Sequence, residues 1–505
     1  MNIKQAKDYI RNTIDLYLKK DEYGEYRIPV VRQRPVFLLG APGVGKTAIM
    51  EQIAQELGIA LVSYSMTHHT RQSALGLPFI EEKEYEGERY QVSEYTMSEI
   101  IASIYDVMRD SGIREGILFL DEINCVSETL APSMLQFLQY KVFGRHKVPE
   151  GWVIVTAGNP PEYNKSVREF DIVTMDRLKI LDVDADYGVW KEYAVNQQIH
   201  NVITSYLELK KEHFYLVETT VRGRSYVTAR GWEDLSQMIL LYEEAGLPVD
   251  ETLVGQYLRN ERVVKEFTAY YDLYNKYKKN YHVDEILDGK LPEEALARAH
   301  AASFDERLSL LGMLIDRIQT EIRKNVENAD WMNALVAPLK ALLSGAEKEK
   351  QASAVIDMLE QQIESRRRQM DIMQKANSLS DEDRKKFRGV LRFLEETKKG
   401  LYEETVITAA DALEQIRQRF DTAVAEMKKE TGRTKNRLHS LFVFVETAFE
   451  EGNEMLILVT ELTVNTSSSR FIAMFGSEDY RKHNESLRLS GRQEELLQEI
   501  EQLEL

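Results

Sequence analysis

Cysteine is nearly absent from this sequence, because only Cys125 carries a thiol among 505 residues. No disulfide can therefore form within the chain, and a zinc site built from several thiolates is excluded. Long apolar runs are missing as well: no stretch of about 18 apolar residues occurs, and the first residues lack the apolar centre of a signal peptide. We therefore expect no membrane span and a reducing cytoplasm as the location.

The sequence also lacks an excess of positive charge and long proline-rich linkers. It has 65 Lys and Arg residues against 83 Asp and Glu, a net charge of -18, and only 11 prolines. Such an acidic chain argues against nucleic acid or an anionic membrane as the main partner, although a local basic groove stays open. A hydrophobic share of 43% is typical of a globular protein, and the length favours about three domains.

The strongest signal that is present is a glycine-rich segment between a strand pattern at residues 36–39 and a helix pattern from Ala48. This order is the context that a phosphate-binding loop requires. The glycines let backbone N–H groups converge on phosphate, Lys46 can reach the β- and γ-phosphates, and the Thr47 hydroxyl can coordinate Mg²⁺. The segment is Gly40, Ala41, Pro42, Gly43, Val44, Gly45, Lys46 and Thr47.

Polar side chains follow two further apolar strand patterns. In the segment 116–124 a run of four apolar residues ends in Asp121 and Glu122, and in the segment 152–161 an apolar strand pattern ends in Asn159. Because ligands bind at the carboxyl ends of strands in open α/β sheets, Asp121 suits Mg²⁺ beside Thr47, and Glu122 suits polarising the attacking water. Asn159 can bind the γ-phosphate or that water, but an ordinary Asn-Pro turn explains the local sequence equally well.

Five strand patterns alternate with helix patterns over residues 1–186, which predicts an α/β domain with a parallel sheet between two helical layers. Within it we expect a hairpin insertion in residues 65–98, a helix at 133–142 and a short hairpin at 141–149. Residues 187–288 read as helical and rich in aromatic residues. Residues 289–505, after a boundary at Asp288–Pro292, are almost wholly helical. Their apolar stripes fit core positions first, and a docking surface is left open.

The series of motifs resembles the AAA+ ATPases, and within them the MoxR family. Residues 40–47 are similar to Walker A, 118–124 to Walker B with its Asp-Glu-Ile-Asn ending, and 156–161 to sensor 1. The resemblance implies Asn159 as the sensor, Arg177 in residues 175–178 as an arginine finger for a neighbouring subunit, with Arg168 as the alternative, and Arg230 in residues 228–232 as sensor 2. Cys125 and Leu178 stand where the family often has Arg and Phe.

The resemblance also implies what the protein does and how it is built. It implies an ATPase that uses ATP and Mg²⁺ in a hexameric ring, with a helical lid at residues 187–288 and a client- or partner-binding region at 289–505. The implied role is chaperone-like: remodelling of a partner protein or insertion of a metal cofactor, the partner often carrying a von Willebrand factor A domain. Two alternatives stay open, a nucleic-acid motor of the same clade, using Arg145, His146 and Lys147, and a nucleotide-gated scaffold with slow turnover.

Overall fold

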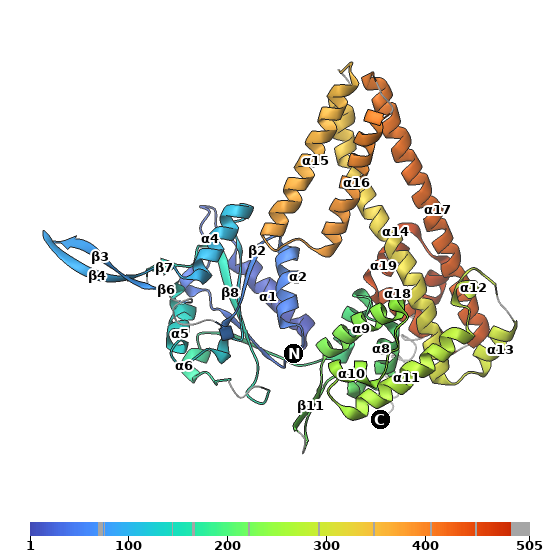
Figure 1. The fold of residues 1–505 in the computed structure, drawn as a ribbon, viewed down its shortest axis with the longest axis horizontal. Helices are drawn as coiled ribbons and strands as arrows, with labels where there is room; N and C mark the ends of the chain where they lie inside the picture. Colours follow the sequence, from blue (N-terminus) through green and yellow to red (C-terminus); the bar gives the residue numbers. More distant parts are fainter. Residues whose placement is uncertain are drawn as a thin grey trace, which may run out of the picture. The chain divides into compact units, whose positions relative to one another are not determined.

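The computed structural model describes residues 1–68, 74, 76–143, 145–163, 167–220, 223–290, 293–346, 349–403, 407–449 and 452–485. The chain forms two compact units (Figure 1). The first unit holds Met1–Val189 and Glu364–Phe387, and the second holds Trp190–Ile363 and the chain from Arg388 onwards. Gly144 of the predicted short hairpin, and Leu291 and Pro292 of the predicted boundary, lie outside the described residues.

The first unit is built on a parallel five-stranded sheet in the order β2-β5-β8-β1-β9, which confirms the predicted fold class. The register sets Leu39 of β1 opposite Gly158 of β8, so the residues that follow these two strands emerge side by side. The strands are β1 (Val36–Gly40), β2 (Ala60–Ser65), β5 (Gly116–Asp121), β8 (Trp152–Gly158) and β9 (Lys179–Val183).

Helices flank this sheet, and their ends follow from local sequence. Asn2 and Gln5 form a reciprocal capping box at the start of α1. Gly58 and Gly112 end α2 and α4 with left-handed backbone, which costs glycine little. The predicted helix at 133–142 is displaced by two residues, because α5 begins at Ala131 and Lys141, with a φ of 57°, ends it after Tyr140. The helices are α1 (Ile3–Tyr17), α2 (Lys46–Leu57), α4 (Glu99–Ser111), α5 (Ala131–Tyr140) and the short α6 (Ile172–Met175).

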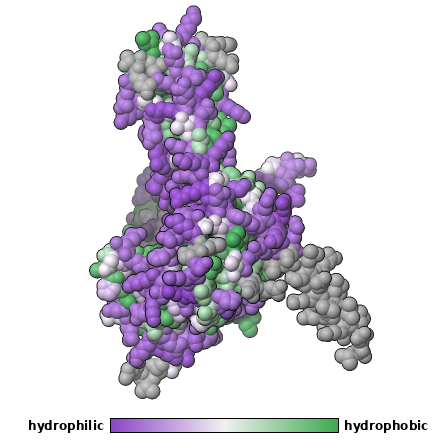
Figure 2. Space-filling view, turned by 90° about the vertical axis from the view of Figure 1, so that its right-hand side faces the viewer, coloured by the Kyte–Doolittle hydropathy of each residue, from purple (hydrophilic) through white to green (hydrophobic). Residues whose placement is uncertain are grey.

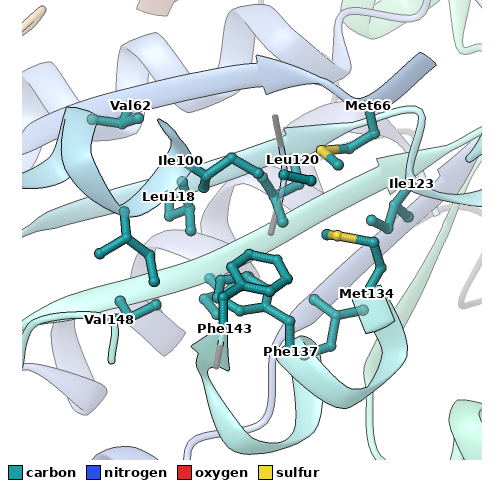
Figure 3. Close-up of a cluster of buried hydrophobic side chains, with 14 of the residues drawn as sticks. Val62, Met66, Ile100, Leu118, Leu120, Ile123, Met134, Phe137, Phe143 and Val148 are labelled. Carbon is teal, nitrogen blue, oxygen red and sulfur yellow. The ribbon is translucent and has the colours of Figure 1, made fainter. Parts of the chain in front are cut away.

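One apolar core lies against the sheet in this unit, with the alternate residues Leu118 and Leu120 of β5 pointing into it (Figure 3). Phe137 and Phe143 stack in parallel within it, with 3.9 Å between their ring centroids. Because these rings come from α5 and from β6, the stacking fixes the hairpin that follows α5 against the body of the unit.

Two antiparallel hairpins extend this unit, at the positions predicted for them. The first pairs β3 (Pro78–Tyr85) with β4 (Glu88–Tyr95), a ribbon that projects from the unit in Figure 1. The second pairs β6 (Val142–Phe143) with β7 (His146–Lys147). The hairpins contact each other, since Arg145 forms an ion pair with Glu94 and His146 lies 3.2 Å from the carbonyl of Tyr95.

The second unit is mostly helical. Its centre is α14 (Phe304–Ala346), 43 residues long, packed with α17 (Ala409–Phe449) around a cluster that includes Leu314 and Phe444. Arg437 is only 2% exposed and forms ion pairs with Asp284, Asp288 and Glu321. The other long helices are α9 (Ala229–Ala245), α11 (Glu261–Asn280), α15 (Ala352–Lys375) and α16 (Asp381–Glu403), the last two crossing between the units.

Shorter elements complete the second unit. An antiparallel pair, β10 (Leu216–Thr220) and β11 (Gly223–Val227), lies inside the region that the sequence predicts as helical. The remaining helices are α7 (Tyr187–Asn196), which begins in the first unit, α8 (Asn201–Leu209), α10 (Glu251–Tyr257), α12 (Val283–Leu287), α13 (Glu293–Ala301), α18 (Asn453–Val464) and α19 (Thr466–Phe475).

The face drawn in Figure 2 is largely hydrophilic, with hydrophobic residues scattered over it. In the described part of the chain, every helix is too short or too polar to cross a membrane.

Candidate functional site

The glycine-rich loop connects β1 to α2 and has the backbone that phosphate binding needs. Gly43 and Gly45 adopt φ values of 78° and 95°, in the left-handed region that favours glycine. At Gly40 a Cβ atom would lie 2.6 Å from the carbonyl oxygen of Val183, so only glycine fits beside β9. The start of α2 therefore directs its backbone N–H groups and the positive end of its dipole towards the loop that follows β1.

Lys46 lies at the base of this loop with its side chain 8% exposed. Its ammonium group donates to the carbonyl oxygens of Gly40 and Ala41, at 2.7 and 2.9 Å, and to Oδ1 of Asn159 at 2.8 Å. The sequence prediction named Lys46 and Asn159 separately, and the structure brings them together because β1 and β8 are paired. The amine is thus held where phosphates cradled by the loop would lie.

Thr47 and Asp121 form a pair of oxygen ligands next to Lys46. The Thr47 hydroxyl donates to Oδ2 of Asp121 at 3.1 Å, and the backbone N–H of Glu122 donates to Oδ1 at 2.8 Å. Hydroxyl and carboxylate oxygens fit Mg²⁺, which usually keeps several waters and takes phosphate oxygens as further ligands. Among the described residues no group of three or more His, Cys, Asp and Glu could hold a metal, so the ion would depend on the nucleotide for the rest of its shell.

Glu122 follows Asp121 with a φ of 56°, a left-handed conformation that is uncommon outside glycine. Its Oε2 accepts hydrogen bonds from the hydroxyl groups of Ser65 and Thr67, both at 2.9 Å. Neither Ser65 nor Thr67 is part of a sequence motif that predicts this contact. The available signal was their place at the end of β2, because parallel strands end at one edge of the sheet and β2 neighbours β5.

Asn124 and Gly158 fix the position of Asn159. Asn124 is 4% exposed, and its amide donates to the carbonyl oxygen of Asn159 at 2.8 Å. A Cβ atom at Gly158 would lie 2.5 Å from Oδ1 of Asn124, so this glycine leaves the space that the amide fills. The Asn159 backbone is thereby anchored while its side chain faces Lys46.

Cys125 comes next in the same turn and is half-buried. Burial raises the pKa of its thiol, and the carboxylates of Glu122 and Asp121 raise it further. The thiol is therefore mainly protonated at neutral pH and is not an activated nucleophile.

The three arginines from the resemblance do not join this cluster in the described contacts. Arg177 is exposed, and its guanidinium donates to Oε1 of Gln139 at 2.6 Å. Arg168 forms an ion pair with Glu128 at 2.5 Å. Arg230 is an exposed residue in the first turn of α9, on the second unit. Their roles remain predictions.

One protein-family model matches part of this chain. Residues 36–175 match the model of the AAA family, described as the ATPase family associated with various cellular activities. The matched segment runs from β1 to α6 and includes the loop, Asp121, Glu122 and Asn159. It follows that this chain contains an AAA ATPase domain and is a hydrolase of nucleoside triphosphate.

Two further comparisons add little. A search of curated proteins gave no match. Among solved structures, NtrX from Brucella abortus is similar at 16% identity with a TM-score of 0.23, and the match covers 40% of this chain and 40% of that chain. A likeness of that extent has no bearing on the fold or function of the whole chain.

Proposed function

We propose that this chain, whose residues 36–175 form an AAA ATPase domain, is a MoxR-type AAA+ ATPase that works as a ring oligomer, with six subunits as the expected number. Mg²⁺-dependent ATP hydrolysis drives a chaperone-like action on a partner protein, either remodelling it or inserting its metal cofactor. A protein with a von Willebrand factor A domain is the partner class that the MoxR resemblance suggests. The helical residues 289–505 are proposed to bind the client or partner.

The observation that carries the hydrolytic part is the convergence of four predicted side chains at one sheet edge. Lys46 contacts Asn159 at 2.8 Å, and Thr47 contacts Asp121 at 3.1 Å. The first pair supplies a cation for the phosphates and a polar amide for the γ-phosphate. The second pair supplies two oxygen ligands for a divalent ion. The bound ion would neutralise developing phosphate charge.

The roles of the chain's own groups follow from their positions. The loop N–H groups and Lys46 bind the phosphates, while Thr47 and Asp121 orient the metal. Glu122, at the end of β5, polarises the attacking water once its carboxylate turns from Ser65 and Thr67. Asn159 positions the γ-phosphate or that water.

The oligomeric part of the proposal concerns Arg177. The described contacts place its guanidinium against Gln139 and not against Lys46, Thr47 or Asp121. Because this guanidinium is exposed on the surface of the first unit, a second copy of the chain can reach it. Supplied in this way, an arginine finger is worth about 10³–10⁵ in rate in other nucleotide hydrolases.

Mixing of two inactive variants tests this proposal directly. Lys46→Ala removes nucleotide binding but keeps the finger, and Arg177→Ala keeps binding but removes the finger. Each variant alone should lose at least 99% of its turnover, which corresponds to about 2.7 kcal/mol of transition-state binding. Mixed rings should regain activity at interfaces where Arg177 of a Lys46→Ala subunit faces an intact site. Arg168→Ala in place of Arg177→Ala is the matched control.

The outcome separates the parts of the proposal. Recovery in the Arg177→Ala mixture, with an Arg168→Ala protein that is active alone, supports Arg177 as the finger in trans. Full activity of Arg177→Ala as a dilute single subunit would contradict the ring mechanism while leaving the ATPase intact. A pull-down with Glu122→Gln, which should bind ATP without hydrolysing it, tests the client part by identifying what is retained.

The nucleic-acid motor is disfavoured by one structural observation. Two of the three side chains that it would need, Arg145 and His146, are engaged by the neighbouring ribbon through Glu94 and the Tyr95 carbonyl. That ribbon is acidic, because residues 78–95 hold six Glu residues against Lys83 and Arg89. Hydrolysis that DNA stimulates, with a steep loss at higher salt, would restore this alternative.

A further inference from the structure

A short segment far along the sequence returns to the first unit and contacts its sheet. It is the turn segment, residues 376–380, which joins α15 to α16 (Figure 1). The carbonyl oxygen of Ala376 accepts a hydrogen bond from the N–H of Leu61 at 3.0 Å, and the Asn377 amide donates to the carbonyl oxygen of Leu61 at 3.2 Å. Both backbone groups of Leu61 that face the outer edge of β2 are thus paired.

The turn segment is well specified by its own residues. Asn377 has a φ of 52°, a left-handed position that asparagine tolerates. The N–H of Ser378 donates back to the carbonyl of Met373 at 3.0 Å, which closes the end of α15. The Ser380 hydroxyl accepts from the N–H of Asp383 at 3.0 Å, as the cap of α16.

The turn segment is also packed into the first unit and not merely laid upon it. Ala376 is fully buried and belongs to the same apolar cluster as Leu118 and Leu120. Ser378 and Leu379 are 3% and 8% exposed. A segment with this burial is part of the folded unit, so its contact with β2 is a specific one.

β2 connects this contact to the hydrolytic site. It is an edge strand, paired on its inner side with β5 through Leu61 opposite Ile117. Four residues after Leu61 the same strand reaches Ser65, and Thr67 follows. These are the two hydroxyl donors that hold Glu122. The turn segment therefore holds one end of a strand whose other end holds the proposed water-activating carboxylate.

We propose that Ala376 and Asn377 are positioning residues that regulate ATP hydrolysis through β2, a role that rests on the proposed function of Glu122. While the turn segment holds Leu61, Ser65 and Thr67 stay in line to retain Glu122. The carboxylate cannot turn towards a water at the phosphate loop without losing two hydrogen bonds. Release of the turn segment loosens the edge strand and frees Glu122.

The helices on both sides of the turn segment indicate what would release it from Leu61. α15 and α16 run from the turn segment into the second unit, where Leu359 and Leu394 belong to a shared apolar cluster. A partner protein that binds this helical pair and alters its packing would act on Leu61 through two continuous helices. Altered packing of α15 against α16 is thus the event that we expect to release the turn segment, and its expected effect is faster hydrolysis.

Asn377→Gly is the sharpest test. Glycine accepts the left-handed backbone at least as well as asparagine, so the turn is kept and only the amide bond to Leu61 is lost. The turnover number should rise, by up to about fivefold if the bond is worth a typical hydrogen bond. The Michaelis constant for ATP should not change, because the phosphate loop is not altered. Gln374→Ala, an exposed position one turn earlier on α15, is the matched control and should turn over ATP at the wild-type rate.

A second background separates regulation from simple destabilisation. Ser65→Ala with Thr67→Val removes both donors to Glu122 and should itself raise turnover. Added to this background, Asn377→Gly should have no further effect, because both act through the same carboxylate. A rate unchanged by Asn377→Gly alone, or changed equally in both backgrounds, would overturn the coupling. Normal hydrolysis by Glu122→Gln would instead overturn the role of Glu122 on which the coupling depends.

Discussion

Gly158→Ala offers the most direct test of how the site is held together. The added Cβ would lie 2.5 Å from Oδ1, 2.7 Å from Cγ and 2.9 Å from Nδ2 of Asn124. Contacts below 3.0 Å cannot persist, and Asn124 is 4% exposed, with little room to move. The Asn124 amide must therefore leave its place and lose its hydrogen bond to the carbonyl of Asn159.

The expected loss of folding stability has two contributions. Overpacking of a dense core by one methyl group costs about 1–3 kcal/mol, and the lost hydrogen bond about 1 kcal/mol. The first unit should lose about 2–4 kcal/mol, which for about 200 residues lowers its Tm by roughly 5–15 °C. Displacement of Asn159 also weakens its contact with Lys46. A loss of about 1.4 kcal/mol there corresponds to tenfold lower kcat/KM for ATP.

Thermal unfolding and steady-state ATP hydrolysis measure the two effects. Gly432→Ala is the matched control, since a Cβ there meets nothing within 4 Å and lies in the middle of α17, where alanine is favoured. Asn124→Ala combined with Gly158→Ala should cost less than the sum of the single changes, because it removes the clashing amide. A Gly158→Ala protein with wild-type Tm and turnover would refute this reasoning.

Three further predictions concern single cations. Lys46→Ala removes three hydrogen bonds, so ATP affinity measured by nucleotide titration should fall about 100-fold or more, and equal affinity would contradict the loop assignment. Burial lowers the pKa of Lys141 from 10.5 to about 8, so the folded state binds this proton less tightly than the unfolded state. Stability should rise as pH increases from about 8 to 10.5, by about 3 kcal/mol, and Lys141→Met should abolish that rise in denaturant titrations. Arg437→Met should cost about 3–5 kcal/mol, because the Glu321 carboxylate, 20% exposed, loses its cation, whereas Asp284 at 61% exposed can be solvated. The hydrogen bond from Arg437 lowers the pKa of Asp284, so its stabilisation is present at neutral pH and lost below about pH 4, a loss that Arg437→Met should lessen.

The sheet and the cluster at its edge could be predicted because local sequence specifies both. Each strand is a short apolar run with a turn after it, and parallel strands expose their last residues at one edge. Asp121 and Asn159 end such strands, and Lys46 begins the helix after a third, so their meeting follows from topology. The loop glycines added a motif with a fixed spacing.

The parts that escaped prediction depend on contacts between distant residues. Leu61 and Ala376 are 315 positions apart, and neither lies in a sequence pattern that predicts their contact. The strands β10 and β11 are five residues each and lie among helical patterns, where periodicity cannot separate short elements. Ser65 and Thr67 read as ordinary strand-end residues until β2 is placed beside β5. The roles of Arg177, Arg168 and Arg230 rest on assembly and domain placement, which one sequence does not encode locally.

The solitary thiol at Cys125 gives the molecule a built-in reporter. An alkylating dye can attach at one place, four residues beyond Asp121, in the turn that follows β5. Since the neighbouring carboxylates raise the thiol pKa, Glu122→Gln should speed its labelling. Labelling kinetics would thus register the charge of Glu122 beside the thiol in real time, without any engineered probe.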